Sequence, residues 1–379
     1  MKYPFRQYHL LQILEEYDEE DIPLDLCIAR YFRQNKALGS KDRAEIAGTA
    51  YGLIRWKGLV DAQLDETSTW EERLNLYLKL DFDLASTDEK ISSYQQVSFP
   101  EELFVLLAEA YGEERAKEIC LHSNQEAPMT IRANETKISR DELIERLPKD
   151  EVVVKKTSKS PWGITFSKRR NLFTLPQFKE GLFEVQDEAS QLVANLVNPK
   201  PGDSILDFCA GSGGKTLAFA HKLQGKGQLY LHDIRKHILI EAKRRLKRAG
   251  IQNAQVIDYK SEKLKKLKKK MNWVLVDAPC SGTGTLRRNP DMKWRFDCEM
   301  LQRLQGQQRT IFEQALSYVK PGGHIVYSTC SILPQENQEQ VEHFLKTYNL
   351  EMLSPSFQSF PEPNEGDGFF AAVFKLRIP

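Results

Sequence analysis

The sequence predicts an α/β fold in which a doubly wound, mostly parallel sheet fills the C-terminal half of the chain. From residue 183 onward, short apolar strands alternate with helical stretches. Between residues 126 and 182, short alternating pieces surround one helix-like stretch, and residues 1–125 carry apolar side chains at spacings of three and four. We therefore expect three domains: an all-helical domain over residues 1–125, a small α+β module over 126–182 and the sheet domain over 183–379.

The N-terminal segment shows helical periodicity in stretches such as YHLLQILEEY and DLCIARYFRQ. Its start, MKYPFRQYHL, has no apolar core of the signal-peptide type. No apolar stretch of the chain approaches the roughly 18 residues of a membrane helix. With 41% hydrophobic and 28% charged residues, the composition is typical of a globular protein. We expect a cytoplasmic location and no membrane partner.

Charge is distributed unevenly along the 379 residues, although the formal net charge is only +1. Residues 1–125 contain 14 Lys/Arg against 24 Asp/Glu, whereas residues 235–270 contain 14 basic and 3 acidic residues. Residues 155–173 interleave basic with aromatic side chains, a pattern that suits phosphates and stacked bases. Any single basic run could be a solvated helix face, but together they favour a polyanionic partner.

A glycine-rich turn follows the first strand of the sheet domain, in SILDFCAGSGGKT. In open α/β sheets, ligands bind beyond the carboxyl ends of the strands, and glycines allow the backbone to approach a ligand closely. A phosphate-binding P-loop would also end in Gly-Lys-Thr, but it requires glycine at the position that Cys209 occupies, so a nucleotide hydrolase is disfavoured. The alternative is a nucleoside cofactor.

Acidic residues end three successive strands, at Asp207, Asp233 and Asp258. Each alone could be a helix N-cap or a turn residue. As a set they suit ribose hydroxyls, an adenine amino group and the cationic groups of S-adenosylmethionine better than a dinucleotide pyrophosphate. We therefore expect S-adenosylmethionine as the cofactor.

Two of the six cysteines lie in strand-end loops, Cys280 in DAPCSG and Cys330 in YSTCS. No C-x-x-C pair exists, so the sequence indicates neither a zinc site nor a disulfide framework, and we expect reduced thiols and no metal. Adjacent strand ends would bring both thiols into one cleft beside Asp277. A lone cysteine is usually a small buried hydrophobe, but that explanation does not suit two cysteines flanked by Gly, Ser and Thr.

The segments LDFCAGSGGKT, VLVDAPCSGTG, RRNPDMKW, YSTCS and GDGFFAAVFKL resemble, in order and spacing, the RNA cytosine-5 methyltransferases of the RsmB/Nop/NSUN family. The resemblance covers the catalytic half closely and extends to APMTIRAN, which is similar to the small RNA-contacting module of that family. Residues 41–64 more weakly resemble the NusB-like helical domain of its bacterial ribosomal RNA members. The resemblance implies a Rossmann-like class I methyltransferase sheet that produces 5-methylcytosine.

The resemblance also implies roles for four residues. Cys330 would add to carbon 6 of cytosine, which makes carbon 5 nucleophilic. Asp277 would stabilise charge at N3, Lys215 would favour the thiolate, and Cys280 would help to resolve the adduct. From the sequence alone the two cysteines could exchange roles, because DNA cytosine-5 methyltransferases carry their nucleophile in a Pro-Cys pair like Pro279-Cys280. Methylation of an amino group is disfavoured, because DAPC lacks the second proline and the aromatic residue of that motif.

The strand ends and the resemblance together predict a set of cofactor-binding residues. They are Asp207, Cys209, Ala210, Gly211, Ser212, Gly213, Gly214, Lys215, Asp233, Arg235, Asp258, Asp277 and Pro279. The first motif of the family usually reads CAAPGGK, whereas this chain has Gly211 and Ser212 in the third and fourth positions. We expect the loop to bind the cofactor nevertheless, with altered affinity.

RNA contacts are predicted at basic side chains of the small module and of the segment after Cys280, with further contacts from the basic helix over residues 243–248. The individual residues are Lys155, Lys168, Arg169, Arg170, Arg287, Arg288 and Lys293. The first hypothesis is a monomeric methyltransferase that acts on ribosomal RNA in a single-stranded or flipped-out form. Transfer RNA is the alternative substrate, and a non-catalytic RNA-binding or ribosome-assembly protein on the same scaffold is the alternative class. The acidic residues 1–125 fit an RNA grip less well; the alternatives are a protein contact or a local basic patch, such as RYFRQNK, that positions RNA.

Overall fold

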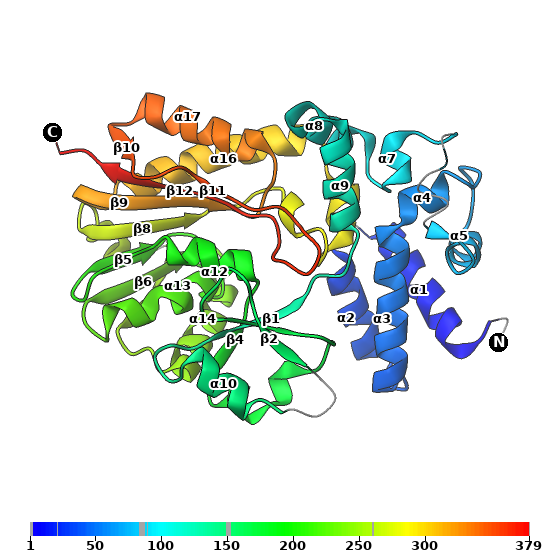
Figure 1. Cartoon of the computed structure of the whole chain (residues 1–379), viewed down its shortest axis with the longest axis horizontal. Coiled ribbons are helices and arrows are strands. Elements are labelled where there is room, and N and C mark those ends of the chain that lie inside the picture. The colour runs from blue at the N-terminus through cyan, green and yellow to red at the C-terminus, as the bar shows by residue number, and fades with distance from the viewer. Residues whose placement is uncertain are drawn as a thin grey trace. The chain divides into compact units, whose positions relative to one another are not determined.

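The computed structural model describes residues 3–20, 22–82, 88, 90–148, 153–259 and 261–378. The chain forms two compact units (Figure 1). The helical unit consists of residues 1–126 together with residues 285–300, and the sheet unit consists of residues 127–284 and 301–379. Among the described residues, no helix is long and apolar enough to cross a membrane.

The helical unit is built from amphipathic helices around one apolar core. Its helices are α1 (Phe5–Glu19), α2 (Leu24–Gln34), α3 (Ser40–Arg55), α4 (Lys57–Asp61), α5 (Trp70–Tyr77), α7 (Ser93–Gln96), α8 (Glu101–Tyr111) and α9 (Glu113–Ser123). Local signals set the helix ends: Pro23 and Pro100 precede α2 and α8, and Thr69 caps α5 by accepting a hydrogen bond from the Glu72 amide. The core includes Leu14 and Leu53, both fully buried.

Residues 285–300 form part of this helical unit although they follow the Cys280 loop in the chain. Lys293 lies in a short 3-10 helix (Pro290–Arg295), and its Nζ donates to the Arg55 carbonyl (2.7 Å) and to Asn124 Oδ1 (2.8 Å). Trp294 Nε1 donates to the carbonyl of Ile54 (2.7 Å). The last carbonyls of a helix lack intrahelical partners and favour cations, which explains why the end of α3 accepts these donors. A division of the chain at residues 125 and 182 does not anticipate this insertion.

The sheet unit contains a small antiparallel sheet in the order β2-β3-β1-β4. Its strands are β1 (Met129–Ala133), β2 (Val154–Lys156), β3 (Gly163–Phe166) and β4 (Phe183–Val185), and it also contains α10 (Arg140–Arg146) and α11 (Pro176–Lys179). Ile131, Ile164 and Phe183 are fully buried against Leu143 of α10. These residues form the apolar core of the small antiparallel sheet.

The large sheet has the strand order β10-β12-β9-β8-β5-β6-β7. Its strands are β5 (Ser204–Asp207), β6 (Gln228–Asp233), β7 (Ala254–Asp258), β8 (Met271–Asp277), β9 (Val319–Thr329), β10 (Leu350–Met352) and β12 (Phe370–Leu376), and β11 (Phe357–Gln358) pairs with β12. Strands β5 to β9 are parallel, whereas β10, β11 and β12 pair antiparallel. Strand β5 pairs with both β6 and β8, so the chain direction across the sheet reverses there, which is where ligands bind in such sheets.

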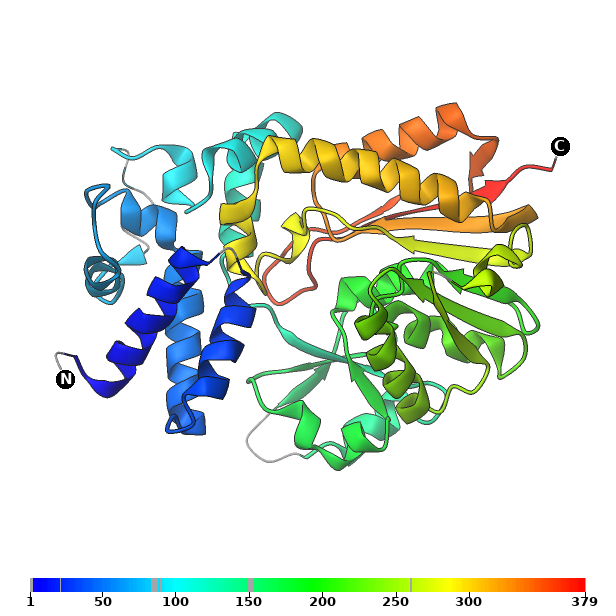
Figure 2. The ribbon, with the colours of Figure 1, turned by 180° about the vertical axis from the view of Figure 1, so that it is seen from behind.

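Helices cover both faces of the large sheet, which confirms the predicted doubly wound α/β fold. They are α12 (Glu188–Asn195), α13 (Gly214–Phe219) and α14 (Lys236–Ala249) on one face, and α15 (Glu262–Lys265), α16 (Cys298–Leu316) and α17 (Gln338–Thr347) on the other. Phe312 of α16 and Phe344 of α17 stack in the core of their face with ring centroids 3.7 Å apart. Figure 2 shows α16, in gold, running along the sheet.

Candidate active site

The thiols of Cys280 and Cys330 lie 3.4 Å apart. Strands β8 and β9 are parallel neighbours in which Asp277 pairs with Ser328, so the loops that follow them begin at the same edge of the sheet. Hydrogen bonding to Cys330 and burial raise the pKa of Cys280 well above its ordinary value. Cys280 therefore retains its proton and can donate it in a hydrogen bond to the sulfur of Cys330.

A buried glutamate holds the Cys280 loop in place. Glu336 is fully buried, and its carboxylate accepts hydrogen bonds from the Ser281 amide (2.9 Å), from Ser281 Oγ (2.5 Å) and from Gln308 Nε2 (2.9 Å). Gln308 also donates to the carbonyl of Pro279 (3.0 Å). A carboxylate with several donors is a strong anchor in a dry interior, so the backbone around Cys280 is fixed.

The loop after β9 has its own buried anchor. Asn337 Nδ2 donates to the carbonyl of Ser331 (2.9 Å), and its Oδ1 accepts from Thr329 Oγ1 (2.6 Å). The amide of Gly284 donates to the carbonyl of Cys330 (2.9 Å), which ties the two cysteine loops together. These contacts keep both sulfur atoms at hydrogen-bond distance.

An ion pair lies beside the thiols. Lys215 Nζ donates to Asp277 Oδ2 (2.5 Å), and Ser328 Oγ donates to Asp277 Oδ1 (3.0 Å). Burial opposes protonation of Lys215, but the Asp277 carboxylate outweighs it and raises the pKa of Lys215. The ammonium group interacts electrostatically with Cys330 and lies 5.2 Å from the centre of the Phe369 ring. A positive charge in this position favours a thiolate nearby.

The glycine-rich loop joins β5 to α13 and bends through Gly211 and Gly213, whose φ angles are 53° and 80°. Asp233 Oδ2 accepts from the amide of Gly211 (2.9 Å), and its Oδ1 accepts from the amide (2.9 Å) and Nε (3.0 Å) of Arg235. Burial opposes ionisation of Asp233, but the hydrogen bonds from Arg235 and Gly211 lower its pKa. Asp233 therefore presents an ionised carboxylate at the end of β6.

The other predicted cofactor residues surround the same strand ends. Asp258 ends β7 opposite Asp233 and lies 3.5 Å from Lys236 Nζ. Cys209 is half-buried and packs against the core, and its removal from solvent raises its pKa. The amide of Ala210 donates to the carbonyl of His232 (2.8 Å). Carboxylates on successive strands and a loop without bulky side chains fit the ribose, the amino groups and the sulfonium of S-adenosylmethionine. These carboxylates and this loop therefore suit S-adenosylmethionine.

Asp207, at the end of β5, is buried beneath the loop. Its Oδ2 accepts a hydrogen bond from Thr216 Oγ1 (2.6 Å), and its Oδ1 has no hydrogen-bond partner among the described residues. Burial raises the pKa of Asp207 to about 7. A charged, buried carboxylate oxygen without a hydrogen bond destabilises the folded state, so protonation of Asp207 stabilises the folded state.

The raised pKa of Asp207 predicts a pH-dependent stability. The unfolded carboxyl group titrates near pH 4, so between roughly pH 4 and 7 the folded state binds the additional proton. This contribution to the free energy of unfolding is complete below about pH 4 and is lost as the pH rises through 7. Asp207→Asn should flatten the pH dependence of the free energy of unfolding between about pH 4 and 7, measured by urea unfolding. The exposed Asp65→Asn serves as the control, and equal slopes for Asp207→Asn and wild type would contradict this account.

The structure separates the predicted RNA-binding residues into two groups. Lys155, Lys168 and Arg169 are exposed on the small sheet and its following loop, and Arg170 is half-buried. Arg287 and Lys293 are each only 1% exposed, and Arg288 is half-buried. Arg287 and Lys293 are therefore not available to phosphates in this structure. The prediction for these two residues requires correction, because the carbonyl of Arg287 accepts from Arg55 Nη2 (3.0 Å) and Lys293 caps helix ends.

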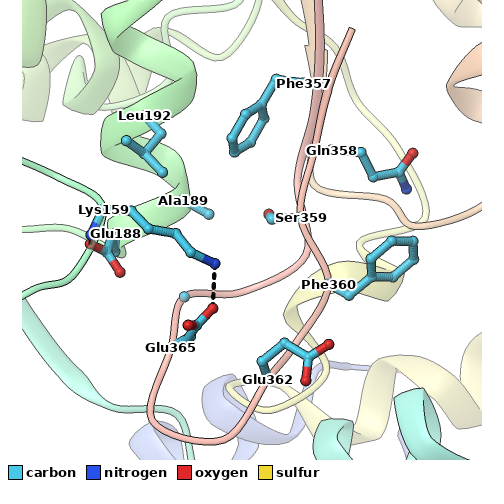
Figure 3. A pocket seen from close by; sticks show the side chains of 11 residues that line it. Lys159, Glu188, Ala189, Leu192, Phe357, Gln358, Ser359, Phe360, Glu362 and Glu365 are labelled. Atoms are coloured by element: carbon cyan, nitrogen blue, oxygen red, sulfur yellow. Dashed lines mark hydrogen bonds and ion pairs between the residues drawn. The ribbon is translucent and has the colours of Figure 1, made fainter.

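A cleft of about 210 Å³ lies between the start of α12 and the loop that joins β11 to β12 (Figure 3). Phe357 points into it on the side of Leu192, and Lys159 forms an ion pair with Glu365 across it. Phe357 and Cys330 pack against the same apolar cluster, which includes Phe369. Neither thiol lines this cleft, and none of its lining residues comes from the ends of β5, β6 or β7.

Several residues that build the site were not predicted from the sequence. They are Thr216, Arg245, Ser328, Glu336, Asn337 and Phe369. Glu336 and Asn337 follow YSTCS by only a few positions, so their place after a strand end was a usable signal. Arg245 lies in the basic helix and has no such signal.

Comparison with known proteins identifies the family. The profile described as 16S rRNA methyltransferase RsmB/F matches residues 194–375, and the profile of its ferredoxin-like domain matches residues 99–172. The probable ribosomal RNA small subunit methyltransferase B of Synechocystis sp. is 33% identical over 373 residues, which cover 93% of this chain and 82% of that protein. The chain belongs to the RsmB/F family of methyltransferases. The predicted family is thereby confirmed, and with it S-adenosylmethionine as the cofactor.

Other members and solved structures agree with this assignment. The ribosomal RNA small subunit methyltransferase B of Vibrio vulnificus is 35% identical over 327 residues, covering 84% of this chain and 74% of that protein. A methyltransferase homolog protein from Pyrococcus horikoshii is 27% identical with a TM-score of 0.66, covering 75% of this chain and 97% of its own. The crystal structure of PH0851 shares the fold, with 22% identity, a TM-score of 0.81 and 99% coverage of both chains.

Proposed function

We propose that this RsmB/F protein methylates carbon 5 of cytosine in ribosomal RNA through a covalent adduct with Cys330. The observation that carries the proposal is the pair of thiols 3.4 Å apart beside the Lys215–Asp277 ion pair. Methyltransferases that act on already nucleophilic atoms need no thiol, whereas carbon 5 of cytosine must first be activated. The names of the relatives, ribosomal RNA small subunit methyltransferase B, favour ribosomal RNA as the substrate.

The proposed reaction begins with attack on the pyrimidine ring. The thiolate of Cys330 forms a bond to carbon 6, and the electron pair of the ring shifts toward N3. Lys215 Nζ donates a hydrogen bond to Asp277, and a proton from Lys215 can pass through Asp277 to N3 as the negative charge develops there. Carbon 5 then has the electron density of an enamine. The cofactor, when bound, supplies an electrophilic methyl group on a sulfonium.

The second half of the reaction restores the aromatic ring. Once carbon 5 carries the methyl group, its remaining proton must leave; Cys280, which retains its own proton, positions the base that accepts it. The electrons of that carbon–hydrogen bond re-form the double bond between carbons 5 and 6, Cys330 leaves as a thiolate, and the N3 proton returns through Asp277 to Lys215. The raised pKa of Cys280 supports this division of roles, because a thiol that retains its proton is a poor nucleophile.

The target base has to leave any helical stack to reach Cys330, so we expect a single-stranded or flipped-out cytosine. The exposed cations Lys155, Lys168 and Arg169 on the small sheet are proposed to bind the flanking phosphates. Each neutralised phosphate makes binding salt-dependent. Their exposed positions contrast with the buried Arg287 and Lys293.

The test is an assay with methyl-labelled S-adenosylmethionine and purified RNA. Small-subunit ribosomal RNA, free or in particles, is compared with transfer RNA, and the labelled nucleoside is identified after digestion. We expect label in 5-methylcytosine of ribosomal RNA. Label in transfer RNA alone would assign the alternative substrate, label in another nucleoside would contradict the proposed chemistry, and cofactor binding without transfer to any RNA would favour a non-catalytic assembly protein.

A further inference from the structure

The glycines of the cofactor loop do not by themselves fix the loop in one conformation. Ser212 lies between Gly211 and Gly213, both of which adopt positive φ angles. Glycine has more backbone freedom to lose than any other residue, so a loop of this composition is costly to order. Contacts from outside the loop must therefore fix its conformation.

Arg245 of α14 supplies such contacts. Its Nη1 donates to Ser212 Oγ (2.5 Å) and to the Ser212 carbonyl (3.2 Å). The other side of the guanidinium group, Nε and Nη2, donates to Glu184 Oε2 (3.1 and 3.0 Å). Arg245 is thus a planar group held at both edges, and such bidentate geometry fixes orientation as well as energy.

Glu184 connects this arrangement to the small sheet. It lies in β4, its side chain is only 4% exposed, and its Oε1 accepts from Arg248 Nη2 (2.6 Å). Arg245 and Arg248 were expected at an RNA-binding helix face, but both point to this buried carboxylate. One carboxylate of the small sheet therefore orients the arginine that holds the cofactor loop.

We propose that Arg245 is a positioning residue for the cofactor loop, and that Glu184 tunes the affinity for S-adenosylmethionine from the small sheet without touching the loop. The proposal rests on the cofactor site described above. Pre-ordering a loop raises affinity because the ordering entropy is not lost on binding. Removing Arg245 should therefore weaken cofactor binding.

The test measures the Kd of S-adenosylmethionine by calorimetry for Arg245→Met, Ser212→Ala and Glu184→Gln. We expect about a 10-fold increase for Arg245→Met, the equivalent of about 1.4 kcal/mol, and about 3-fold increases for the other two. For Glu184→Gln, whose side chain does not touch the loop, the KM for RNA and the kcat at saturating cofactor should stay near wild type. Because the two side chains act as one contact, the double variant Ser212→Ala/Arg245→Met should bind no more weakly than Arg245→Met.

Arg244→Met is the matched control, because Arg244 is 75% exposed on the same helix and pairs only with Glu241 among the ion pairs of the described residues. Thermal unfolding separates positioning from general support of the fold. If Arg245→Met and Glu184→Gln lowered the Tm but left the Kd of the cofactor unchanged, or if the double variant showed additive losses, the proposal would be wrong. Failure of the wild-type protein to bind S-adenosylmethionine would instead contradict the cofactor site itself.

Discussion

Replacing Cys330 by alanine should abolish methyl transfer, with a loss on the order of 10⁴-fold or more, as for other covalent nucleophiles. Without the thiolate, carbon 5 of cytosine is too weak a nucleophile to take the methyl group. Replacing Cys280 by alanine should also stop turnover, but for a different reason: the adduct with Cys330 forms and is not resolved. The two variants therefore differ in a visible product, a protein–RNA adduct that survives denaturation.

A denaturing gel with labelled RNA and nucleoside analysis measure both effects. Cys298→Ala is the matched control, since Cys298 is exposed and lies outside the two cysteine loops. An adduct that accumulates with Cys330→Ala and is absent with Cys280→Ala would reverse the assigned roles. Full activity of both variants would eliminate the covalent mechanism.

Replacing Lys293 by alanine should lower the free energy of unfolding by roughly 2–5 kcal/mol, the range for a large-to-small substitution in a packed interior. Lys293 is fully enclosed, and burial lowers its pKa well below the ordinary value. Its loss leaves the Arg55 carbonyl and Asn124 Oδ1 without their donor and opens a cavity beside Phe99, whose ring centre lies 4.5 Å from Lys293 Nζ. The helical unit should lose stability first.

Urea unfolding followed by circular dichroism measures this loss, with the exposed Lys36→Ala as the control. RNA affinity is measured in parallel under native conditions. If Lys293→Ala were as stable as wild type and bound RNA more weakly, the side chain would contact phosphate as the basic sequence first indicated. That result would contradict the buried position of Lys293.

The elements and most of the strand-end residues were predictable because parallel strands end at one edge of a sheet. Asp233 and Asp258 are register partners on β6 and β7, and Asp277 and Ser328 are partners on β8 and β9. The position of each acidic residue at the end of its strand was therefore enough to predict that these side chains lie at one edge of the sheet. The fold class needed only the alternation of strands and helices.

The buried polar anchors were not predictable, because their partners are distant in sequence. Lys293 finds its acceptors 238 and 169 positions away, and Arg245 finds Glu184 61 positions away. A lysine or arginine in a basic run is solvated by default, and only the tertiary structure shows an exception. Glu336 likewise lies in a stretch, PQEN, whose composition is typical of a surface turn, although its side chain is fully buried.

The helical unit is built from two separate stretches of the chain, so it cannot be completed until the second stretch has been synthesised. Residues 1–126 leave the ribosome first, but the segment that supplies Lys293 and Trp294 follows about 170 residues later. At roughly 5–20 residues per second, the nascent helices wait about 10–35 s for these side chains. During that time the carbonyls at the end of α3 lack their native donors. A nascent chain that stops before residue 285 should therefore carry a protease-sensitive N-terminal region, which becomes resistant once residue 300 has emerged.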